Sequence, residues 1–166
     1  MRSRAAALAG SALFLVIAPG TVAGLLPFLI SRWRRSGDFG GSEAIELAGL
    51  VLILAGGAAL LECFFRFAWT GLGTPAPVAP TRKLVVSGLY RHVRNPMYVA
   101  VVTLVIGQAL WFGSLDLLAY GAAVWLAFHL FVLLYEEPTL RRQFPDDYAD
   151  YTRHVRRWLP RLRPWR

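Results

Sequence analysis

The 166-residue chain has almost no cysteine and few histidines, which limits the chemistry that it can perform. Its one cysteine, Cys63, lies in an apolar run, so no disulfide can form within the chain. The three histidines, His92, His129 and His154, lie far apart in sequence, and no Cys/His group has the spacing of zinc ligands. We therefore expect neither a disulfide-stabilised domain nor a metal site.

Acidic residues are also scarce, with 10 Asp and Glu against 18 Lys and Arg and a formal net charge of +8. Nucleic acid is not the expected partner, because the basic residues lie in loops beside apolar runs and in the tail rather than along one soluble helix face. That distribution is typical of contact with anionic lipid headgroups. Hydrophobic residues make up 56% of the chain and the mean hydropathy is +0.46, which predicts a small polytopic membrane protein.

Four apolar runs predict an all-α integral-membrane bundle that forms a single domain. The expected spans are followed by an amphipathic cytoplasmic tail, in the order 5–30, 44–69, 96–112, 115–135 and tail 136–166. Thr21-Val22-Ala23 in the first run is similar to a signal-peptide cleavage site, but apolar residues continue to Ile30, so we expect a retained span with a weak point at Pro19-Gly20. Gly113-Ser114 predicts a tight turn that makes the last two spans an antiparallel hairpin.

The distribution of Lys and Arg near the span ends predicts the orientation. The two loops that would lie outside hold Arg32, Arg34 and Arg35, whereas the segments that would lie inside hold fourteen basic residues. The positive-inside rule therefore predicts that both termini are cytoplasmic, in a plasma or inner membrane. The loop around Asn95 and the tail then lie on the same side.

Ionisable residues within the expected spans usually face the bundle interior. Glu62 and Arg66 are four residues apart, which puts them on one helical face and favours an ion pair. Such a pair either neutralises itself in the bundle or lines a polar cavity. His129 precedes Glu136 by seven residues, so the two share nearly one stripe of a helix, where His129 is either a packing residue or part of a site.

Two adjacent carboxylates, Glu136 and Glu137, stand where the last apolar run meets the basic tail. Pro138 follows them and biases Glu137 away from the α region, which predicts a bend or a helix restart. A pair of carboxylates at such a corner suits a cationic ligand. The alternative is that they are only solvated or favour the N-terminus of the next helix.

The connection between the second and third spans holds turn signals and apolar residues. Gly71 to Pro77 predicts an irregular loop, and it is no soluble dinucleotide-binding fingerprint because no strand precedes it. Asn95 is a good helix cap, and Pro96 suits the first helical turn. In the tail, arginines alternate with aromatic residues, which predicts a segment at the bilayer interface.

Short motifs in a fixed order connect these features to a known family. They are Gly71-Leu72-Gly73-Thr74-Pro75, Leu84-Val85, Gly88-Leu89-Tyr90, Arg94-Asn95-Pro96-Met97-Tyr98, Glu136-Glu137, and Phe144 with Tyr148 and Tyr151. In this order the chain resembles the isoprenylcysteine carboxyl methyltransferase family and the similar phospholipid methyltransferases, phosphatidylethanolamine N-methyltransferase among them. The resemblance extends from about Gly71 to Leu162.

The resemblance implies an integral-membrane enzyme that binds S-adenosyl-L-methionine between its last two spans and the tail. The sulfonium and ammonium groups of that cofactor are cations, which agrees with a carboxylate corner. The implied cofactor-binding residues are Tyr90, Asn95, Pro96, Tyr98, His129, Glu136, Glu137, Tyr148 and Tyr151. The implied catalytic residues, which would act on the acceptor, are Arg94, Arg153 and His154.

Two departures from the isoprenylcysteine enzymes bear on the acceptor. The isoprenylcysteine enzymes carry Arg-His-Pro where this chain has Arg94-Asn95-Pro96. They also carry an Arg where this chain has His154, so here the neighbouring Arg153 would have to hold a carboxylate substrate. We therefore expect a lipid-like or otherwise apolar acceptor that enters from the bilayer. The alternatives are a membrane reductase of related fold that uses a nicotinamide cofactor, and a non-catalytic small transporter that uses Glu62 and Arg66.

Overall fold

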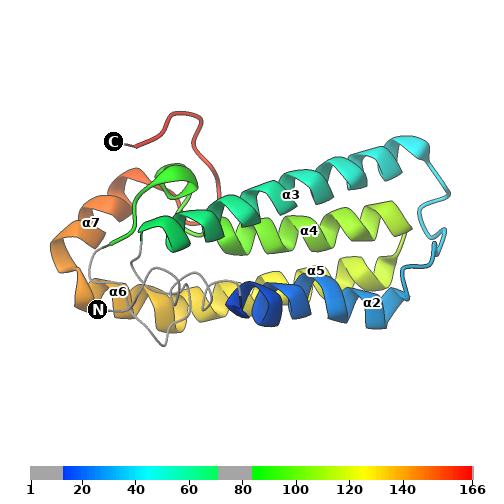
Figure 1. Ribbon diagram of the computed structural model, residues 1–166, viewed down its shortest axis with the longest axis horizontal. Helices are drawn as coiled ribbons and strands as arrows, with labels where there is room; N and C mark the ends of the chain where they lie inside the picture. Colours follow the sequence, from blue (N-terminus) through cyan, green and yellow to red (C-terminus); the bar gives the residue numbers. More distant parts are fainter. Residues whose placement is uncertain (1–12, 71–83, 166) are drawn as a thin grey trace.

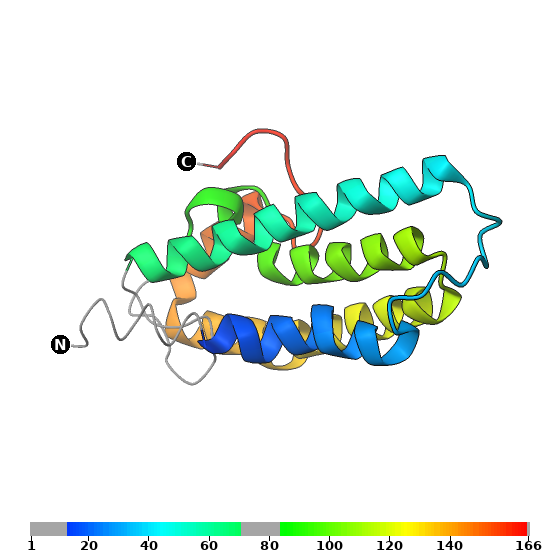
Figure 2. The same ribbon diagram turned by 45° about the vertical axis from the view of Figure 1, so that its right-hand side comes forward.

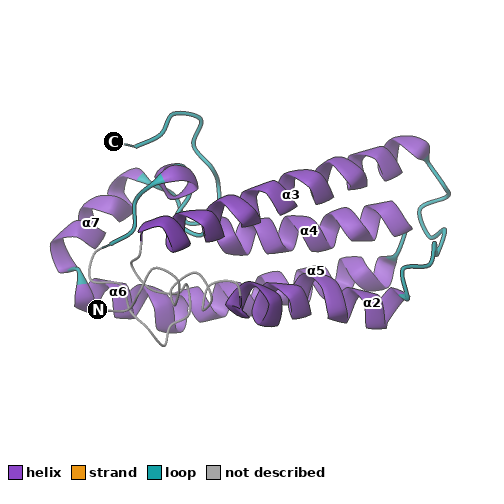
Figure 3. Ribbon diagram, in the orientation of Figure 1, coloured by secondary structure: helices purple, strands orange, loops and turns teal. Residues whose placement is uncertain are grey.

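The computed structural model describes residues 13–70 and 84–165, and this part of the chain forms helices without any strand (Figure 1). The Gly71 to Pro77 loop and the start of the first expected span, residues 5–12, lie outside the described residues. Long helices run side by side along one axis, and short helices cover one end of the bundle (Figures 1 and 3). The predicted all-α bundle is confirmed for this described part.

Three helices are long and apolar enough to cross a membrane: Leu13–Ser31, Glu43–Arg66 within α3 (Glu43–Thr70), and Leu115–Gln143. The last of these contains α5 (Leu115–Phe131), a π-helical turn (Val132–Glu136) and α6 (Glu137–Gln143). Helix α4 (Pro96–Phe112) is apolar but has only 17 residues. At 1.5 Å per residue it is about 26 Å long, slightly less than the hydrocarbon core of about 30 Å. Three of the four predicted spans are therefore long and apolar enough to cross a membrane.

The first helix contains a π-helical turn, Thr21–Leu25, directly before α2 (Leu26–Ser31). Side chains of neighbouring helices bond two carbonyl groups of this turn: Tyr120 donates to the Val22 carbonyl at 2.8 Å, and Gln108 donates to the Ala23 carbonyl at 2.8 Å. Irregular backbone at membrane depth needs such partners, because lipid offers none. The expected weak point at Pro19-Gly20 is thus followed by a turn that the bundle supports.

Among the described helices, α3 and α4 share the most extensive contact, and glycines allow their backbones to approach closely. A Cβ on Gly49 would lie 2.7 Å from the Gly107 carbonyl oxygen, and a Cβ on Gly107 would lie 2.9 Å from the Gly49 oxygen. No other residue type fits such an approach of two backbones, which is a common device of membrane helices. Figure 2 shows the two helices side by side along much of their length.

The predicted hairpin turn between α4 and α5 is confirmed. Gly113 ends α4 with a left-handed φ of 63°, and the Ser114 hydroxyl accepts a hydrogen bond from the Leu117 amide at 3.3 Å. The loop after α2 lies at the same end of the bundle, because Asp38 accepts a hydrogen bond from the Leu115 amide at 3.0 Å. The two loops that were expected on one side of the membrane therefore lie together.

The opposite end holds the 3-10 helix Gly88–Arg91, α6, α7 (Pro145–His154) and the irregular residues that follow α7 (Figure 3). Tyr148, Tyr151 and Val155 are buried there and form a small core of their own. The tail therefore folds onto the bundle end and does not lie as one flat amphipathic segment, because its aromatic side chains find protein partners.

The expected shift of Glu137 out of the α region, with a bend at Pro138, is wrong. Glu137 has φ −61° and ψ −45°, so it stays in the α region and the helix continues to Gln143. In a regular helix the Pro138 ring would meet the carbonyl of Leu134. The π-helical turn Val132–Glu136 widens the helix there and accommodates the ring. The bend comes instead at Phe144, which precedes Pro145 and has φ −136° and ψ 64°.

Candidate functional site

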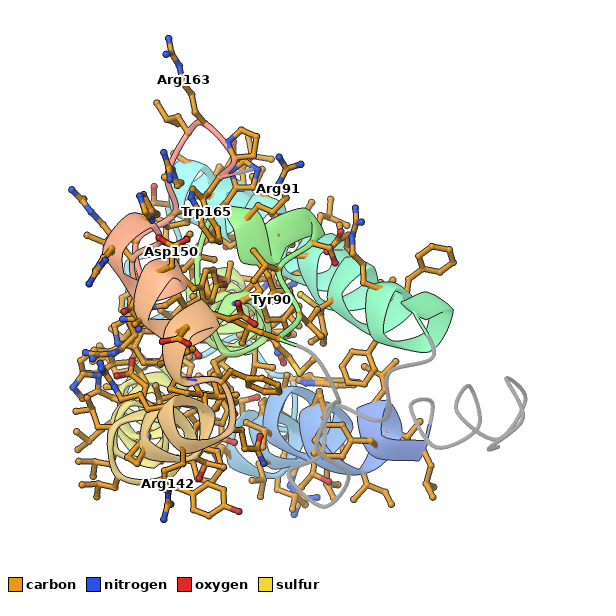
Figure 4. The ribbon with its side chains drawn as sticks, turned by 90° about the vertical axis from the view of Figure 1, so that its left-hand side faces the viewer. Tyr90, Arg91, Arg142, Asp150, Arg163 and Trp165 are labelled. Atoms are coloured by element: carbon orange, nitrogen blue, oxygen red, sulfur yellow. The ribbon has the colours of Figure 1, made fainter. Side chains whose placement is uncertain are left out.

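A segment that we call the C-terminal strap, residues 156–165, runs against the loop before α4. Its backbone exchanges hydrogen bonds of 2.9–3.0 Å with that loop, between Arg94 N and Arg156 O, Arg161 N and His92 O, and Trp165 N and Arg91 O. The Arg91 side chain also donates to the Trp165 carbonyl at 2.8 Å. Figure 4 looks onto this end and shows Arg91 and Trp165 close together, with Tyr90 nearer the centre. The strap thus brings the end of the described chain over the predicted site.

Glu137 is the centre of a buried ion-pair network. Its side chain is only 8% exposed and accepts two hydrogen bonds from the Arg157 guanidinium, at 2.6 and 3.1 Å. Arg94 lies 3.2 Å from the same carboxylate. The hydrogen bond to Glu137 raises the pKa of Arg157, so the strap brings a permanent cation to the carboxylate. Sequence reasoning missed Arg157, because nothing in the tail marks one arginine among many.

Asn95 supports this network and is not the side-chain cap that we expected. Its amide group makes no capping bond to α4, and it donates instead to the Arg157 carbonyl at 3.2 Å. Its backbone has φ −121° and ψ 56° at the N-terminus of α4, and Pro96 follows as the buried first residue of the helix. The Asn95 side chain, which is buried, therefore connects the start of α4 to the strap.

Arg94 also contacts Tyr148, whose hydroxyl lies 3.3 Å from the guanidinium. Burial raises the pKa of Tyr148, and the nearby Glu137 carboxylate adds to the effect, so the phenol stays neutral. The Nε atom of Arg94 is buried and has no hydrogen-bond partner in the described structure. A buried N–H without a partner costs free energy unless a ligand or water meets it. Arg94 therefore has one donor available for an anionic group.

Glu136 has a different environment from its neighbour. Its carboxylate accepts a hydrogen bond from the Tyr98 hydroxyl at 2.8 Å, and no guanidinium is bonded to it in the part of the chain that the structure describes. The Tyr98 ring packs against Phe128 in a tilted arrangement, with 4.7 Å between ring centroids. Its side chain forms one wall of a mainly apolar cavity of about 430 Å³ between the first helix, α4 and α5, lined by Phe14, Ala18, Pro19, Val22, Met97, Tyr98, Val101, Ala127, Phe128 and Phe131.

Tyr90 and Tyr151 join the loop to α7. The Tyr151 hydroxyl donates to the Tyr90 carbonyl at 2.6 Å, and burial raises the pKa of both phenols well above the usual range. The 3-10 helix that carries Tyr90 begins at Gly88, which has a φ of +55°. The predicted ion pair between Glu62 and Arg66 is confirmed. A side chain at Gly88 would overlap this pair, so the pair packs directly against the loop.

His129 does not pair with Glu136, as their common stripe suggested. Trp158 of the strap donates to the His129 ring at 3.0 Å, and Trp125 stacks on the same ring at 5.1 Å between ring centroids. The π-helical turn lies between His129 and Glu136 and adds a residue to the helix, which rotates Glu136 away from the stripe. His129 thus holds the strap.

Arg153 and His154 are exposed at the end of α7 and are not bonded to Glu137 or Arg94 in the described structure. The His154 ring stacks on Trp165 at 5.3 Å and lies 3.3 Å from Asp150. The other predicted residues gather around the loop before α4 and the end of α5. Among residues 13–70 and 84–165, no group of three His, Cys, Asp or Glu side chains lies close enough to hold a metal ion.

The fold and this network define a helical membrane protein with a buried carboxylate–guanidinium site at one end of its bundle. A family model, phospholipid methyltransferase, matches residues 45–147. The match covers more than half of the chain, which therefore belongs to the phospholipid methyltransferase family, and methyl transfer is the activity that this membership implies. The resemblance drawn from the motifs is thereby confirmed. No curated protein and no solved structure matches the chain.

Proposed function

We propose that the protein is an S-adenosylmethionine-dependent methyltransferase that acts on a lipid-like acceptor from the bilayer. The observation that carries the proposal is the junction of Tyr98 and Glu136, where a half-buried carboxylate meets the wall of an apolar cavity. Family membership supports the class of reaction. It lends no support to the reductase or the transporter.

The residues around Glu137 fit the chemistry of S-adenosylmethionine. The unpaired Nε donor of Arg94 suits the carboxylate of the amino-acid part, and Glu136, which has no bonded guanidinium in the described structure, suits a cationic centre. When bound, the cofactor supplies an electrophilic methyl group. Glu137 itself is neutralised by Arg157 and Arg94, so we assign it the task of fixing both guanidiniums rather than direct charge contact with a ligand.

The apolar cavity suits the acceptor. Aromatic and aliphatic side chains form most of its wall, and Tyr98 places a hydroxyl at one side. An acceptor held there has few waters around it, and holding two reactants in one orientation can supply much of the acceleration. Glu136 would attract the positively charged part of an amine acceptor or of the cofactor. We leave Arg153 and His154 out of this site, since they are exposed at the end of α7.

The test is calorimetric titration of S-adenosylmethionine into the purified protein in detergent, followed by transfer of labelled methyl groups to bacterial-type lipid extracts. We expect saturable binding and a labelled lipid product. The same titration with a reduced nicotinamide dinucleotide serves as the control for the reductase. Binding of the nicotinamide without binding of S-adenosylmethionine would refute the proposal.

A further inference from the structure

The strap presents an apolar edge to the outside of the molecule. Leu162 is 97% exposed and Leu159 is 64% exposed, and Leu162 is the most exposed large apolar side chain of the described residues. Neither leucine belongs to a helix that could span a membrane. Exposed single leucines are common, but these two lie three positions apart on an irregular segment whose inner face is bonded to the site.

The position of the strap along the bundle puts these leucines level with the helix ends. In Figure 1 the strap lies level with the C-terminal part of α3 along the bundle axis, and α7 extends further out. Figure 4 looks along that axis and shows Arg163 pointing sideways, away from the bundle. A bilayer that surrounds α3 would therefore meet the strap at the depth of its headgroups.

The charge of the segment favours one kind of surface. Residues 151–166 contain no Asp or Glu, and Arg156 and Arg163 are exposed on either side of the leucines. Long cationic side chains beside buried apolar groups are typical of segments that lie at an anionic membrane interface. Anionic lipid attracts each such cation at short range.

We propose that residues 159–163 form a bilayer-contacting loop, in which Leu159 and Leu162 enter the headgroup–acyl boundary and the flanking arginines bind anionic headgroups. The same strap carries Arg157 to Glu137 and Trp158 to His129 on its inner face. Contact with lipid on the outer face therefore stabilises the strap that completes the site. The inference is independent of which cofactor or acceptor the protein uses.

The experiment places an environment-sensitive fluorophore on Leu162→Cys, with Asp147→Cys as the matched control. Both side chains are exposed, so neither substitution disturbs the fold, and Asp147 lies in the first turn of α7. The wild-type chain gives the background of labelling, because its one cysteine, Cys63, is 0% exposed. Each labelled protein is placed as a single copy in nanodiscs of purely zwitterionic lipid or with anionic lipid added. Quenching by iodide in water and by lipid with a shallow nitroxide is then measured.

We expect the label at position 162 to be quenched by the nitroxide lipid and protected from iodide, more strongly in anionic discs, while the label at position 147 shows the reverse. Arg156→Gln combined with Arg163→Gln should abolish the additional protection from iodide that anionic lipid gives at position 162, and Arg142→Gln should not. Iodide quenching at position 162 equal to that at position 147 in both discs would overturn the proposal. Protection that appears only when several copies share a disc would assign the loop to an interface between copies and would also overturn it.

Discussion

Glu136 and Glu137 are consecutive in the chain, yet their partners differ. Glu137 is bonded to Arg157 and lies 3.2 Å from Arg94, whereas Glu136 accepts a bond from the neutral hydroxyl of Tyr98. One carboxylate is therefore part of the framework, and the other has no cationic partner among the described residues. A substitution of Glu137 should consequently affect stability, whereas a substitution of Glu136 should affect activity.

Glu137→Gln should destabilise the protein. The change leaves two guanidiniums without a counter-charge, and breaking a buried pair costs about 3 kcal/mol or more of the free energy of unfolding. The measurement is chemical unfolding in detergent. Glu46→Gln is the control, because its partner Arg35 is 56% exposed and such pairs contribute less than about 1 kcal/mol. An equal loss in the free energy of unfolding for both variants would contradict the conclusion that Glu137 stabilises the network.

Glu136→Gln should reduce methyl transfer while leaving the free energy of unfolding nearly unchanged. The glutamine oxygen can still accept the bond from Tyr98, but the charge is gone. Hydrogen bonds to charged groups contribute about 1.5–3 kcal/mol, so kcat/KM should fall by about tenfold or more. Tyr98→Phe, which keeps the charge, should reduce kcat/KM less. If Glu136→Gln retains full activity, another group must meet the cation.

At the scale of helices, the α3–α4 contact depends on residues without side chains. Gly49→Ala should separate the two helices, since the new Cβ would lie 2.7 Å from the Gly107 carbonyl oxygen. Overpacking of this kind costs about 1–3 kcal/mol of the free energy of unfolding. Gly57→Ala on the same helix is the control, because among the described residues no atom outside its own stretch of helix lies within 4 Å of its Cβ position. If Gly49→Ala leaves the free energy of unfolding unchanged, the two helices pack less closely than described.

The strap should be released by the loss of one arginine. Arg157→Gln removes both hydrogen bonds to Glu137, so we expect faster proteolysis after Val155 and a loss of methyl transfer. Arg142→Gln on α6 is the control, because its side chain is exposed and bonds only the Pro138 carbonyl among the described contacts. Unchanged proteolysis of Arg157→Gln would mean that backbone bonds alone hold the strap.

The helices could be predicted from the sequence because each is an apolar run bounded by turn signals. The expected spans 44–69, 96–112 and 115–135 agree closely with α3, α4 and α5. The π-helical turn was not predictable from composition, since Pro138 signals a break and does not say how a helix avoids one. That turn also explains why the expected stripe of His129 and Glu136 was lost.

The site could be predicted only in part, for a related reason. Motif order brought together the loop before α4, the two glutamates and the tail tyrosines, which the structure gathers at one end. The partners supplied by the strap, Arg157 and Trp158, lie 20 and 29 residues from Glu137 and His129. An irregular segment has no periodicity that reveals which of its side chains face inward, so their pairing depends on tertiary structure alone.

For the whole molecule, thiol labelling from each side of the membrane measures the orientation. Ser36, in the loop after α2, and Asp116, in the first turn of α5, are exposed at one bundle end. We expect an impermeant thiol reagent to label cysteines at these positions from outside intact cells. A cysteine at Asp147, at the other end, should react only after the cells are opened. The expectation follows from the positive-inside rule, because the bundle end that holds Asp147 carries most of the Lys and Arg. The opposite labelling pattern would reverse the orientation.

The position of the strap in chain order has a consequence for biosynthesis. Arg157 follows every helix of the bundle, so the ribosome delivers it after those helices have been made. N-terminal parts of a chain generally fold first during translation. Until Arg157 arrives, Glu137 has only Arg94 as its cationic partner in the network, and the loop before α4 lacks its bonds to the strap. A nascent chain that stalls at Val155 would therefore possess all its membrane helices and still lack a completed site.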